Sequence, residues 1–346
     1  MNTLSKADLK GMSTPETEEW IRSLGMEPYR ARQIRQWIFN RLACSFDGMT
    51  NLSTSLREML KEEALLNRLE TVRTQLSEDG TKKFLFRLHD NEHIESVLIP
   101  ERDHYTICIS SQAGCAMGCR FCLTGRQGFK RNLLSSEIID QVITVKRSMD
   151  NPERLTNIVF MGMGEPLANY HNVLAAIQNI IAEDAMNFSH RKVTLSTCGL
   201  VPQIRKLGND TTVNLAVSLN AGDDETRNFL MPINRQHNLK SLISACRDFP
   251  LPNRRMITFE YILIDNINDR PEDAIKLVDL LSGIRSKINL IPFNASPDLD
   301  MASPSMEKIM EFQDILIKNH FTAIIRKSKG RDISAACGQL KGNHIP

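Results

Sequence analysis

Three cysteines lie within eight residues of one another in the stretch QAGCAMGCRFCLTG, residues 112–125. Cys115, Cys119 and Cys122 are separated by three residues and then by two. Thiolates bind zinc and the iron of iron–sulfur clusters, and such sites usually take four ligands from the protein. The spacing therefore predicts a metal site at which one protein ligand is missing.

Two kinds of metal site are compatible with these cysteines. A structural zinc site is closed and tetrahedral and usually pairs two C-x-x-C units. This chain has one such unit, Cys119–Cys122, so His104 or Cys108 would have to complete a zinc site. A 4Fe–4S cluster held by three thiolates keeps one iron open for a substrate or cofactor. C-x-x-x-C-x-x-C with an aromatic residue, Phe121, before the last cysteine is typical of radical S-adenosylmethionine enzymes, in which S-adenosylmethionine takes the fourth position.

A second candidate loop, Met161–Leu167 (MGMGEPL), follows a predicted strand. It does not match a dinucleotide fingerprint, because Leu167 stands where the third glycine is needed. It does suit a smaller ligand, since glycine lets the backbone approach closely and Glu165 can accept hydrogen bonds from an ammonium group.

The other cysteines differ in what their positions indicate. Cys44, Cys198 and Cys246 have no identifiable partner and are interpreted as buried or incidental thiols. Cys108 precedes Cys115 by seven residues in a predicted strand and can face the same site. A thiol on a basic, glycine-punctuated tail is a poor core residue and a candidate nucleophile. Cys337 lies on such a tail, residues 327–346, which we expect to be mobile.

A candidate general base lies upstream of the cysteines, in the predicted strand HIESVLIP. The alternation of a strand puts Glu95 on one face with Val97 and Ile99. An apolar face disfavours the charged carboxylate and suits a general base. The alternative is an edge strand on which this acid simply reaches water.

The elements that must position these residues follow a regular pattern. Repeated strand–helix units indicate parallel βαβ structure. The length is too short for a closed eight-fold barrel, so we expect an α/β fold with a partial six-fold β/α barrel at residues 100–326, or an open sheet. Ligands collect beyond the carboxyl ends of such strands, which places residues 112–125 at the mouth. The predicted strands are 106–111, 156–161, 192–197, 213–219, 256–264 and 287–293, and the predicted helices include 136–149, 169–183, 271–283 and 305–319.

Residues 1–99 are predicted to form a smaller accessory region. Thr14-Pro15-Glu16 is a helix-start signal, and apolar residues recur at helical spacing in Tyr29–Leu42. From about residue 70 the period falls to two, with turn signals at residues 78–80 and 90–92. We therefore expect helices followed by short strands.

Composition and charge narrow the class of protein. The 346 residues are 41% hydrophobic and 24% charged, as in an ordinary globular protein. The start of the chain is too polar for a secretory signal, and no long apolar run occurs, so we expect a cytoplasmic protein without a membrane span. Net charge is only +2, but residues 105–136 carry four basic residues and no acid. Such clustering predicts either a groove for a polyanion or a solvated basic loop.

Seven segments together resemble one family. The chain is similar over nearly its whole length to the RlmN/Cfr family of radical S-adenosylmethionine RNA methyltransferases, and most similar to the RlmN branch. That resemblance implies methylation of carbon 2 of adenine 2503 in 23S ribosomal RNA and of adenine 37 in transfer RNA. The segments are QAGCAMGCRFCLTGRQGFKRNL, VFMGMGEPL, VTLSTCG, LAVSLNAGDDETR, MPIN, INLIPFN and DISAACGQL.

The resemblance also implies a mechanism. One S-adenosylmethionine methylates Cys337, and a second, bound at the cluster of the three cysteines, is cleaved to a radical that takes hydrogen from this methyl group. The carbon radical adds to adenine and forms a covalent protein–RNA adduct. Glu95 is implied as the acceptor of the ring proton, and Cys108 as the thiol that attacks the sulfur of Cys337 and leaves a disulfide.

Further residues and partners are implied by the same resemblance. Asn220 departs from the pattern, since many relatives have histidine there. The N-terminal region and the basic loops are expected to grip RNA, the electron donor to be a protein such as flavodoxin, and the enzyme to be a monomer. The implied S-adenosylmethionine contacts are Gly164, Glu165, Ser196, Ser218, Leu219, Asn220 and Asn294.

Two rival functions use the same residues. A Cfr-type enzyme would methylate carbon 8 of adenine with the same cysteines and a different base position. A zinc-containing, non-catalytic RNA-binding module would use the cysteines for structure only.

Overall fold

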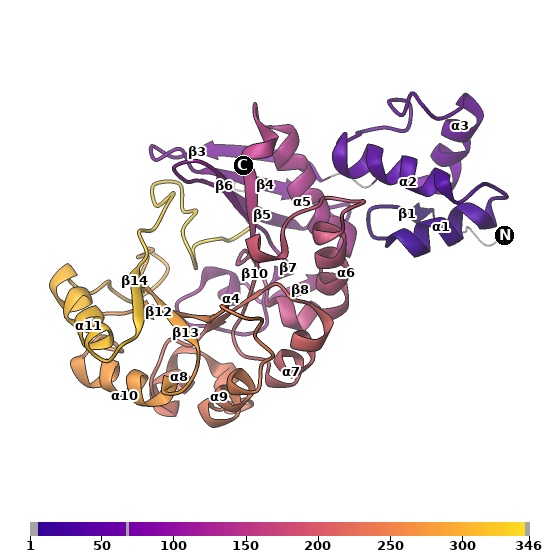
Figure 1. The fold of residues 1–346 in the computed structure, drawn as a ribbon. Helices are drawn as coiled ribbons and strands as arrows, with labels where there is room; N and C mark the ends of the chain where they lie inside the picture. Colours follow the sequence, from indigo (N-terminus) through magenta and orange to yellow (C-terminus); the bar gives the residue numbers. More distant parts are fainter. Residues whose placement is uncertain (1–5, 67–68, 343–346) are drawn as a thin grey trace.

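One large curved sheet organises the chain (Figure 1). The computed structural model describes residues 6–66 and 69–342. In this part of the chain ten strands form one sheet in the order β14-β13-β12-β11-β10-β9-β6-β5-β4-β3. Neighbours from β6 to β14 are parallel, and neighbours from β3 to β6 are antiparallel. The strands are β3 (Glu70–Leu76), β4 (Lys82–Arg87), β5 (His93–Pro100), β6 (Tyr105–Cys108), β9 (Leu155–Phe160), β10 (Val193–Thr197), β11 (Asn214–Ser218), β12 (Ile257–Leu263), β13 (Ser286–Pro292) and β14 (Thr322–Ile325).

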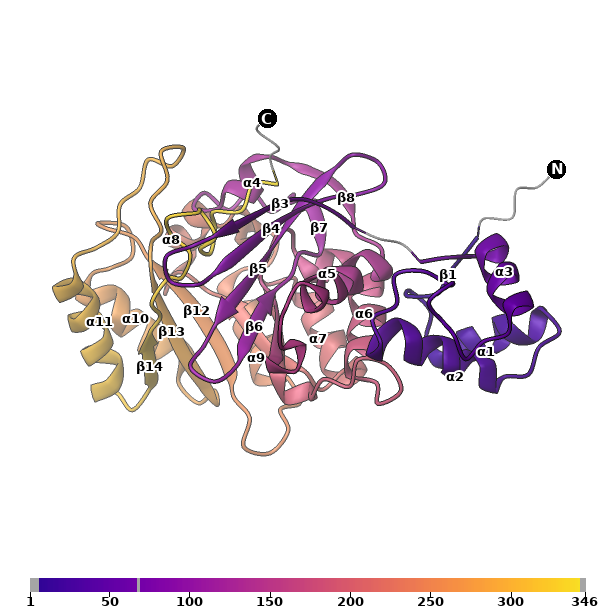
Figure 2. The same cartoon turned by 90° about the horizontal axis from the view of Figure 1, so that it is seen from above.

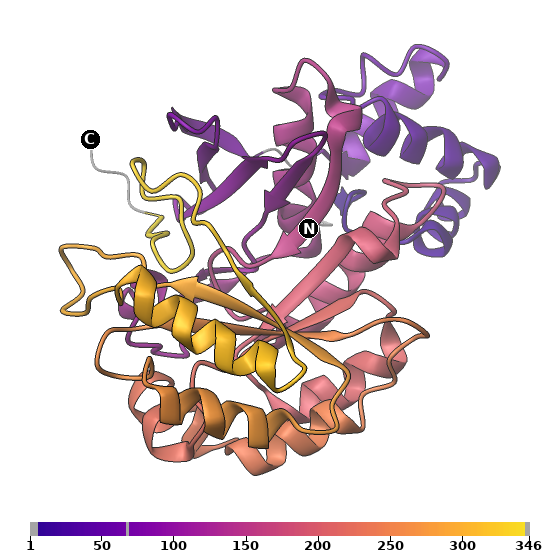
Figure 3. The same cartoon turned by 60° about the vertical axis from the view of Figure 1, so that its left-hand side comes forward.

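Helices connect the parallel strands and cover the outer face of the curved sheet (Figure 3). Their apolar stripes are buried against it, as with Ile138, Ile139 and Val142 of α5, each fully buried. This arrangement leaves the inner face free to line a cavity. The helices are α5 (Ser135–Arg147), α6 (Tyr170–Ile181), α7 (Val201–Asp210), α8 (Asp224–Leu230), α9 (Leu239–Arg247), α10 (Pro271–Leu281) and α11 (Met306–Lys318).

The predicted partial β/α barrel is confirmed, with one strand more than the sequence pattern indicated. All six predicted strands are present as β6 and β9–β13. The additional strand, β14, has the sequence TAII and continues the parallel order beyond β13. Four residues are too short a run to show a clear period.

The N-terminal helices form a unit at one side of the sheet (Figure 2). Its helix α1 is capped by Ser13 rather than by a residue of the predicted start signal, and Ser13 and Glu16 exchange hydrogen bonds as a capping box. Residues 36–40 continue α2 as a π-helical turn. The elements are β1 (Ala7–Asp8), α1 (Thr14–Ser23), α2 (Tyr29–Arg35), α3 (Thr54–Glu63) and β2 (Ala64–Leu65).

The division of the chain differs from the one expected at residue 99. Strands β3–β5, which the sequence placed in the accessory region, are hydrogen-bonded into the barrel sheet through the β5–β6 pair. Their alternating pattern shows that they are strands, but it does not show which neighbour they pair with. Residues up to 66 are the separate helical part.

Buried polar contacts fasten this helical part to the barrel. Lys10 Nζ forms an ion pair with Asp140 of α5, and both side chains are almost fully buried. The other oxygen of Asp140 accepts a hydrogen bond from Leu69 N at 2.8 Å. Arg35 Nη2 donates to Asn179 Oδ1 of α6 at 2.8 Å. The helical part is therefore held on α5 and α6, behind the sheet.

Among the described residues, no helix is both long and apolar enough to cross a bilayer.

Replacing Lys10 tests the strength of this attachment. Lys10→Met leaves the carboxylate of Asp140 buried without its cation, which costs about 3 kcal/mol of unfolding free energy. Urea unfolding of the purified protein measures this loss. The exposed Lys240 offers a matched control, and Lys240→Met is expected to change stability by less than about 0.5 kcal/mol. Equal stability of the two variants would contradict the role of the ion pair.

Candidate active site

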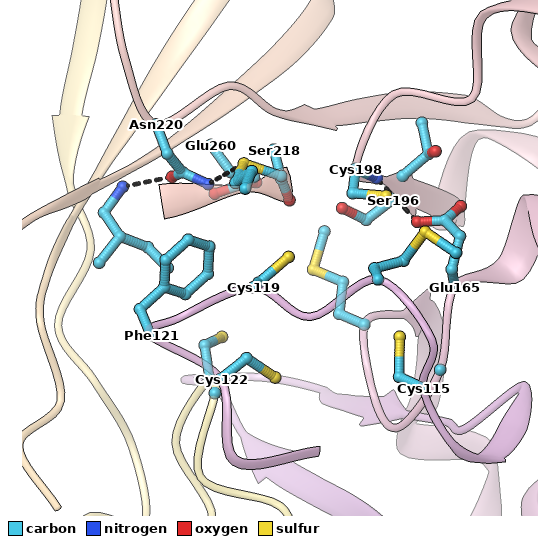
Figure 4. A pocket seen from close by; sticks show the side chains of 18 of the residues that line it. Cys115, Cys119, Phe121, Cys122, Glu165, Ser196, Cys198, Ser218, Asn220 and Glu260 are labelled. Carbon is cyan, nitrogen blue, oxygen red and sulfur yellow. Dashed lines mark hydrogen bonds between the residues drawn. The ribbon is translucent and has the colours of Figure 1, made fainter. Parts of the chain in front are cut away.

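A cavity opens where the parallel strands end, on the inner face of the sheet (Figure 4). It encloses about 850 Å³, including solvent at its mouth. It brings together both candidate loops and the C-terminal tail. Its lining includes Cys115, Cys119, Phe121, Cys122, Gly164, Glu165, Ser196, Cys198, Ser218, Asn220, Glu260, Ile262, Ile291 and Cys337.

The three predicted metal ligands line this cavity from a single loop. The loop lies between β7 (Gln112–Gly114) and the short helix α4 (Leu123–Arg126), and β8 (Phe129–Asn132) pairs with β7 to close it. Gly118, at φ 65°, allows the tight turn between the cysteines. Cys122 N donates to Cys119 O at 3.1 Å, which fixes the C-x-x-C turn.

Burial governs the charge state of these thiols. It raises the pKa of Cys115 to about 12 and the pKa values of Cys119 and Cys122 above their ordinary value. Charge on Cys115 and Cys122 raises the pKa of Cys119 further. The thiols are thus neutral at pH 7 until a metal supplies positive charge to stabilise the thiolates.

The arrangement of the thiol donors is compatible with a cluster. Within the described ranges no three His, Cys, Asp or Glu side chains converge closely enough to hold one metal ion. A cluster does not require such convergence, because each thiolate binds its own iron. Three thiols facing one cavity, with a buried carboxylate opposite, fit a 4Fe–4S cluster and an amino-acid cofactor.

That buried carboxylate is Glu165, at the start of the 3-10 turn Pro166–Asn169. Its Oε2 accepts from Cys198 N at 2.8 Å and its Oε1 from Leu167 N at 3.0 Å. Burial raises the pKa of Glu165, and these hydrogen bonds oppose the rise. The carboxylate is therefore fixed in position and keeps lone pairs that can face a ligand ammonium group.

The glycine beside it has a packing role that the sequence did not reveal. Gly164 has φ 96°, and a Cβ there would lie 2.5 Å from Cβ of Gln112. The Met161–Leu167 loop is thus pressed against the start of the cysteine loop, where Gln112 Oε1 accepts from Glu165 N at 2.8 Å. Glycine is required for contact between the two loops as well as for space in the cavity.

Some of the other residues predicted to contact S-adenosylmethionine line the cavity, and others lie behind its lining. Ser196, Ser218 and Asn220 line the cavity, whereas Leu219 is buried beside it and Asn294 holds the tail through Nδ2 to Cys337 O at 3.2 Å. Asn220 has φ 60°, a conformation that asparagine tolerates well. Its Oδ1 accepts from Ile262 N at 2.8 Å.

A buried arginine beside the cavity was not found from the sequence. Arg227 of α8 is fully buried and donates to the carbonyl oxygens of Leu219, Cys198 and Ser218. Burial lowers its pKa, which charge on Cys198 and Cys119 opposes. Arg227 therefore joins the ends of β10 and β11 and places positive charge near a predicted cluster ligand. Nothing in an isolated arginine of a helix signals this position.

The tail reaches the cavity from β14 by way of strands β3–β5 (Figure 3). Gly338 O and Leu340 O then accept hydrogen bonds from Leu123 N and Thr124 Oγ1 of the cysteine loop. The tail is docked here, and its predicted mobility stays a prediction. Its contacts with the β3–β4 turn and β4 are Ser77 Oγ to Asp332 Oδ1 at 2.5 Å, Gly330 N to Asp79 Oδ2 at 3.0 Å and Lys83 Nζ to Ser334 O at 3.3 Å.

Docking puts Cys337 in the cavity and Cys108 beside it. Cys337 is an exposed residue of the cavity lining, yet desolvation of its thiol raises the pKa to about 11. Cys108, at the end of β6, is buried. Burial raises the pKa of Cys108, and the nearby Cys337 raises it further. The two thiols are thus within electrostatic range of each other, although they lie far apart in the chain.

Glu95 lies under the docked tail rather than in the cavity lining. It is 5% exposed, and its Oε1 lies 3.1 Å from Lys83 Nζ. Its Oε2 accepts from Lys341 N at 2.7 Å and Gly342 N at 3.1 Å. The expected apolar face therefore carries a cation, and both oxygens of Glu95 have partners.

Comparison with known proteins identifies the family. The chain is 53% identical over 342 residues to a dual-specificity RNA methyltransferase RlmN of Syntrophus aciditrophicus, covering 99% of this chain and 98% of that protein. It is 54% identical over 335 residues to the RlmN of Geobacter sulfurreducens, covering 97% and 92%. The chain belongs to the RlmN family.

Two family models and a solved structure agree with RlmN membership. Residues 7–66 match the ribosomal RNA large subunit methyltransferase N-terminal domain, and residues 109–278 match the radical SAM superfamily. A radical SAM methyltransferase from Sphaerobacter thermophilus has a TM-score of 0.94 at 43% identity, covering 97% of this chain and 100% of that one. Membership of this superfamily implies a 4Fe–4S cluster and S-adenosylmethionine.

The cysteine loop predicts a clear response to mutation. Cys119→Ala removes one of three thiolates, so protein purified without oxygen is expected to lose most of its bound iron and sulfide. Iron and sulfide analysis measures the loss. Cys246 is buried on α9, outside the cavity lining, and Cys246→Ala is the matched control that should retain both. Full iron content in Cys119→Ala would exclude this residue as a ligand.

Tail docking predicts a protease phenotype. Burial acts to raise the pKa of Asp79, but hydrogen bonds from Thr81 and Gly330 outweigh it and lower the pKa to about 2. The carboxylate is therefore charged wherever trypsin is active. Asp79→Ala removes the acceptor for Gly330 N, so cleavage after Lys327 or Lys329 should accelerate several-fold.

The neighbouring Glu78→Ala, whose side chain is exposed, is the control for this digestion. Its cleavage rate should equal that of the wild type. An unchanged rate in Asp79→Ala would show that this contact does not hold the tail.

Proposed function

We propose that this protein methylates carbon 2 of adenine in RNA, at adenine 2503 of 23S ribosomal RNA and adenine 37 of transfer RNA. The observation that carries the proposal is the meeting of Cys337 with the three-cysteine loop in one cavity. The identity to RlmN relatives over nearly the full length supports the substrates. Carbon 2 lies between two ring nitrogens and is electron-poor, so ordinary methyl transfer to it is not available.

The cofactors would be held by the residues around the cavity. Cys115, Cys119 and Cys122 would bind a 4Fe–4S cluster, and Glu165 would accept hydrogen bonds from the ammonium group of S-adenosylmethionine. Ser196, Ser218 and Asn220 would complete the binding wall, with Gly164, Leu219 and Asn294 behind it. When bound, these cofactors supply the transferred methyl group and a radical able to abstract hydrogen, with two molecules of S-adenosylmethionine used in each turnover.

Cys337 and Cys108 would hold and release the transferred carbon. The sulfur of Cys337 carries the methyl group and presents it to the base. Cys108 then attacks that sulfur, a disulfide forms, and the bond from Cys337 sulfur to the transferred carbon breaks. Their closeness supports this pairing, and an external reductant must restore the two thiols.

Glu95 would accept the proton that leaves the ring. Its oxygens accept hydrogen bonds from Lys83 and from the amides of Lys341 and Gly342, so release of the tail amides would free further lone pairs to accept the proton. Proton transfer and movement of the tail would thus be coupled.

RNA would reach the cavity by extrusion of the target base from its fold. The helical part, matched by the N-terminal domain of ribosomal RNA methyltransferases, and the basic loops would grip the backbone. An electron donor such as flavodoxin, a monomeric state and a cytoplasmic location complete the proposal.

Analysis of the product tests the reaction. RNA treated with the anaerobically purified protein should contain 2-methyladenine, identified by nucleoside mass spectrometry. Cys337→Ala should reduce transfer to background, because no sulfur is left to carry the methyl group. Cys44, exposed and outside the cavity lining, provides the control: Cys44→Ala should keep wild-type activity.

Two other results would contradict the proposal. Methylation at carbon 8 would indicate the Cfr-type reaction. Methylation by Cys337→Ala would contradict the two-step transfer.

A further inference from the structure

A second pocket opens at the opposite end of the barrel strands. Its floor is formed where β10–β13 begin, by residues such as Thr258, whereas the catalytic cavity is lined two residues further along the same strand by Glu260. It encloses about 1000 Å³, including solvent at its mouth. We call it the basic pocket; its lining is Arg191, Thr194, Asn214, Asn253, Arg254, Arg255, Met256, Thr258 and Lys287.

The basic pocket concentrates positive charge without neutralising it. Four of its nine lining residues are cationic and none is acidic. In the described part of the chain, no carboxylate lies within ion-pair distance of Arg191, Arg254 or Lys287. The charge of Lys287 acts to lower the pKa of Glu260. Glu260, however, lines the catalytic cavity, and its side chain accepts a hydrogen bond from Asn289 Nδ2 at 2.9 Å. Unneutralised cations gathered in a concave site attract anions.

Repulsion among these cations lowers the pKa values of two basic side chains in this region. Burial lowers the pKa of Arg255, and the neighbouring Arg191 lowers it further. Burial also lowers the pKa of His190, as do Arg255 and Arg191. An anion bound between them would relieve this repulsion.

Hydrogen bonds between neighbouring segments hold the walls of the basic pocket in place. Arg255 Nη1 donates to Thr212 O at 2.6 Å and to Asn214 Oδ1 at 3.2 Å. Asn214 Nδ2 in turn donates to Arg191 O at 2.8 Å. Arg255 thus ties its own loop to β11 and, through Asn214, to the loop of Arg191, which leaves Arg191, Arg254 and Lys287 free to contact a ligand.

We propose that the basic pocket binds a phosphate group of the RNA backbone, far from the target base. This inference rests on the proposed function, since it takes folded RNA as the substrate. Guanidinium groups match phosphate geometry with paired hydrogen bonds. Strand β13 has seven residues and rises about 3.3 Å for each, so the two ends of the barrel are roughly 20 Å apart. A folded transfer RNA can span that distance around the barrel, whereas a short hairpin whose target adenine enters the catalytic cavity need not reach the basic pocket.

RNA binding by the anaerobically purified holoenzyme tests the proposal. The double variant Arg191→Ala/Arg254→Ala should bind full-length transfer RNA about tenfold more weakly at about 0.1 M salt, and the slope of log affinity against log salt should fall by about one to two. Affinity for a short hairpin with the target adenine, and kcat, should stay at wild-type values.

The control removes equal charge elsewhere. Lys240 and Lys318 are exposed on α9 and at the end of α11, and Lys240→Ala/Lys318→Ala should bind both RNAs within twofold of the wild type. Neither arginine of the double variant makes a side-chain hydrogen bond in the described residues. The melting temperature should therefore be unchanged, which separates lost binding from misfolding.

Three outcomes decide the matter. Wild-type affinity of the arginine double variant for full-length transfer RNA would overturn the proposal. The proposal would also be overturned if the pocket bound only small anions. In that case inorganic phosphate would raise the melting temperature of the wild type but not of the arginine double variant, and the two proteins would bind RNA equally well. Weaker RNA binding by the double variant, in a protein whose wild type forms no 2-methyladenine, would contradict the proposed function and still support the phosphate site.

Discussion

The docking of the C-terminal tail on strands β3–β5 is the constraint on which the site depends. Without it the cavity has its cysteine loop and its carboxylate but lacks Cys337. The tail is held by backbone groups that bond to acidic side chains, with Asp79 and Glu95 as the acceptors. The tail side chain of Asp332 adds a contact of its own, as the acceptor from Ser77 Oγ. A few hydrogen bonds of this kind fix the segment in place and leave it releasable.

Electrostatics in the cavity are balanced by two buried groups of opposite sign. Glu165 is held by backbone amides on one wall, and Arg227 is held by backbone carbonyls behind another. Each would be costly to bury alone, and each is stabilised by several hydrogen bonds. The carboxylate can meet a cationic ligand, whereas the guanidinium lies near Cys119, where thiolate charge would develop. This polarity is preformed, since both groups have fixed partners.

The residues that do chemistry were more visible in the sequence than the contacts that place them. The cysteine loop has a spacing that local geometry alone explains, and six strands were marked by β-rich runs between helical stretches. β14 was not predicted. β3–β5 were predicted as strands of the accessory region, because alternation identifies a strand but does not encode its pairing. Arg227 and Glu260 were missed because each is an isolated charged residue whose importance comes from burial. Cys108 and Cys337 approach each other only through the tertiary fold, so only the family resemblance indicated that they act together.

The order of strands has a consequence for how the protein is made. Each barrel strand from β10 to β14 lies beside the one that precedes it in the chain, so a growing chain can add them one after another during translation. Cys337 is synthesised after all of them. The cysteine loop and the strands around it can therefore fold before the tail is available to cover them.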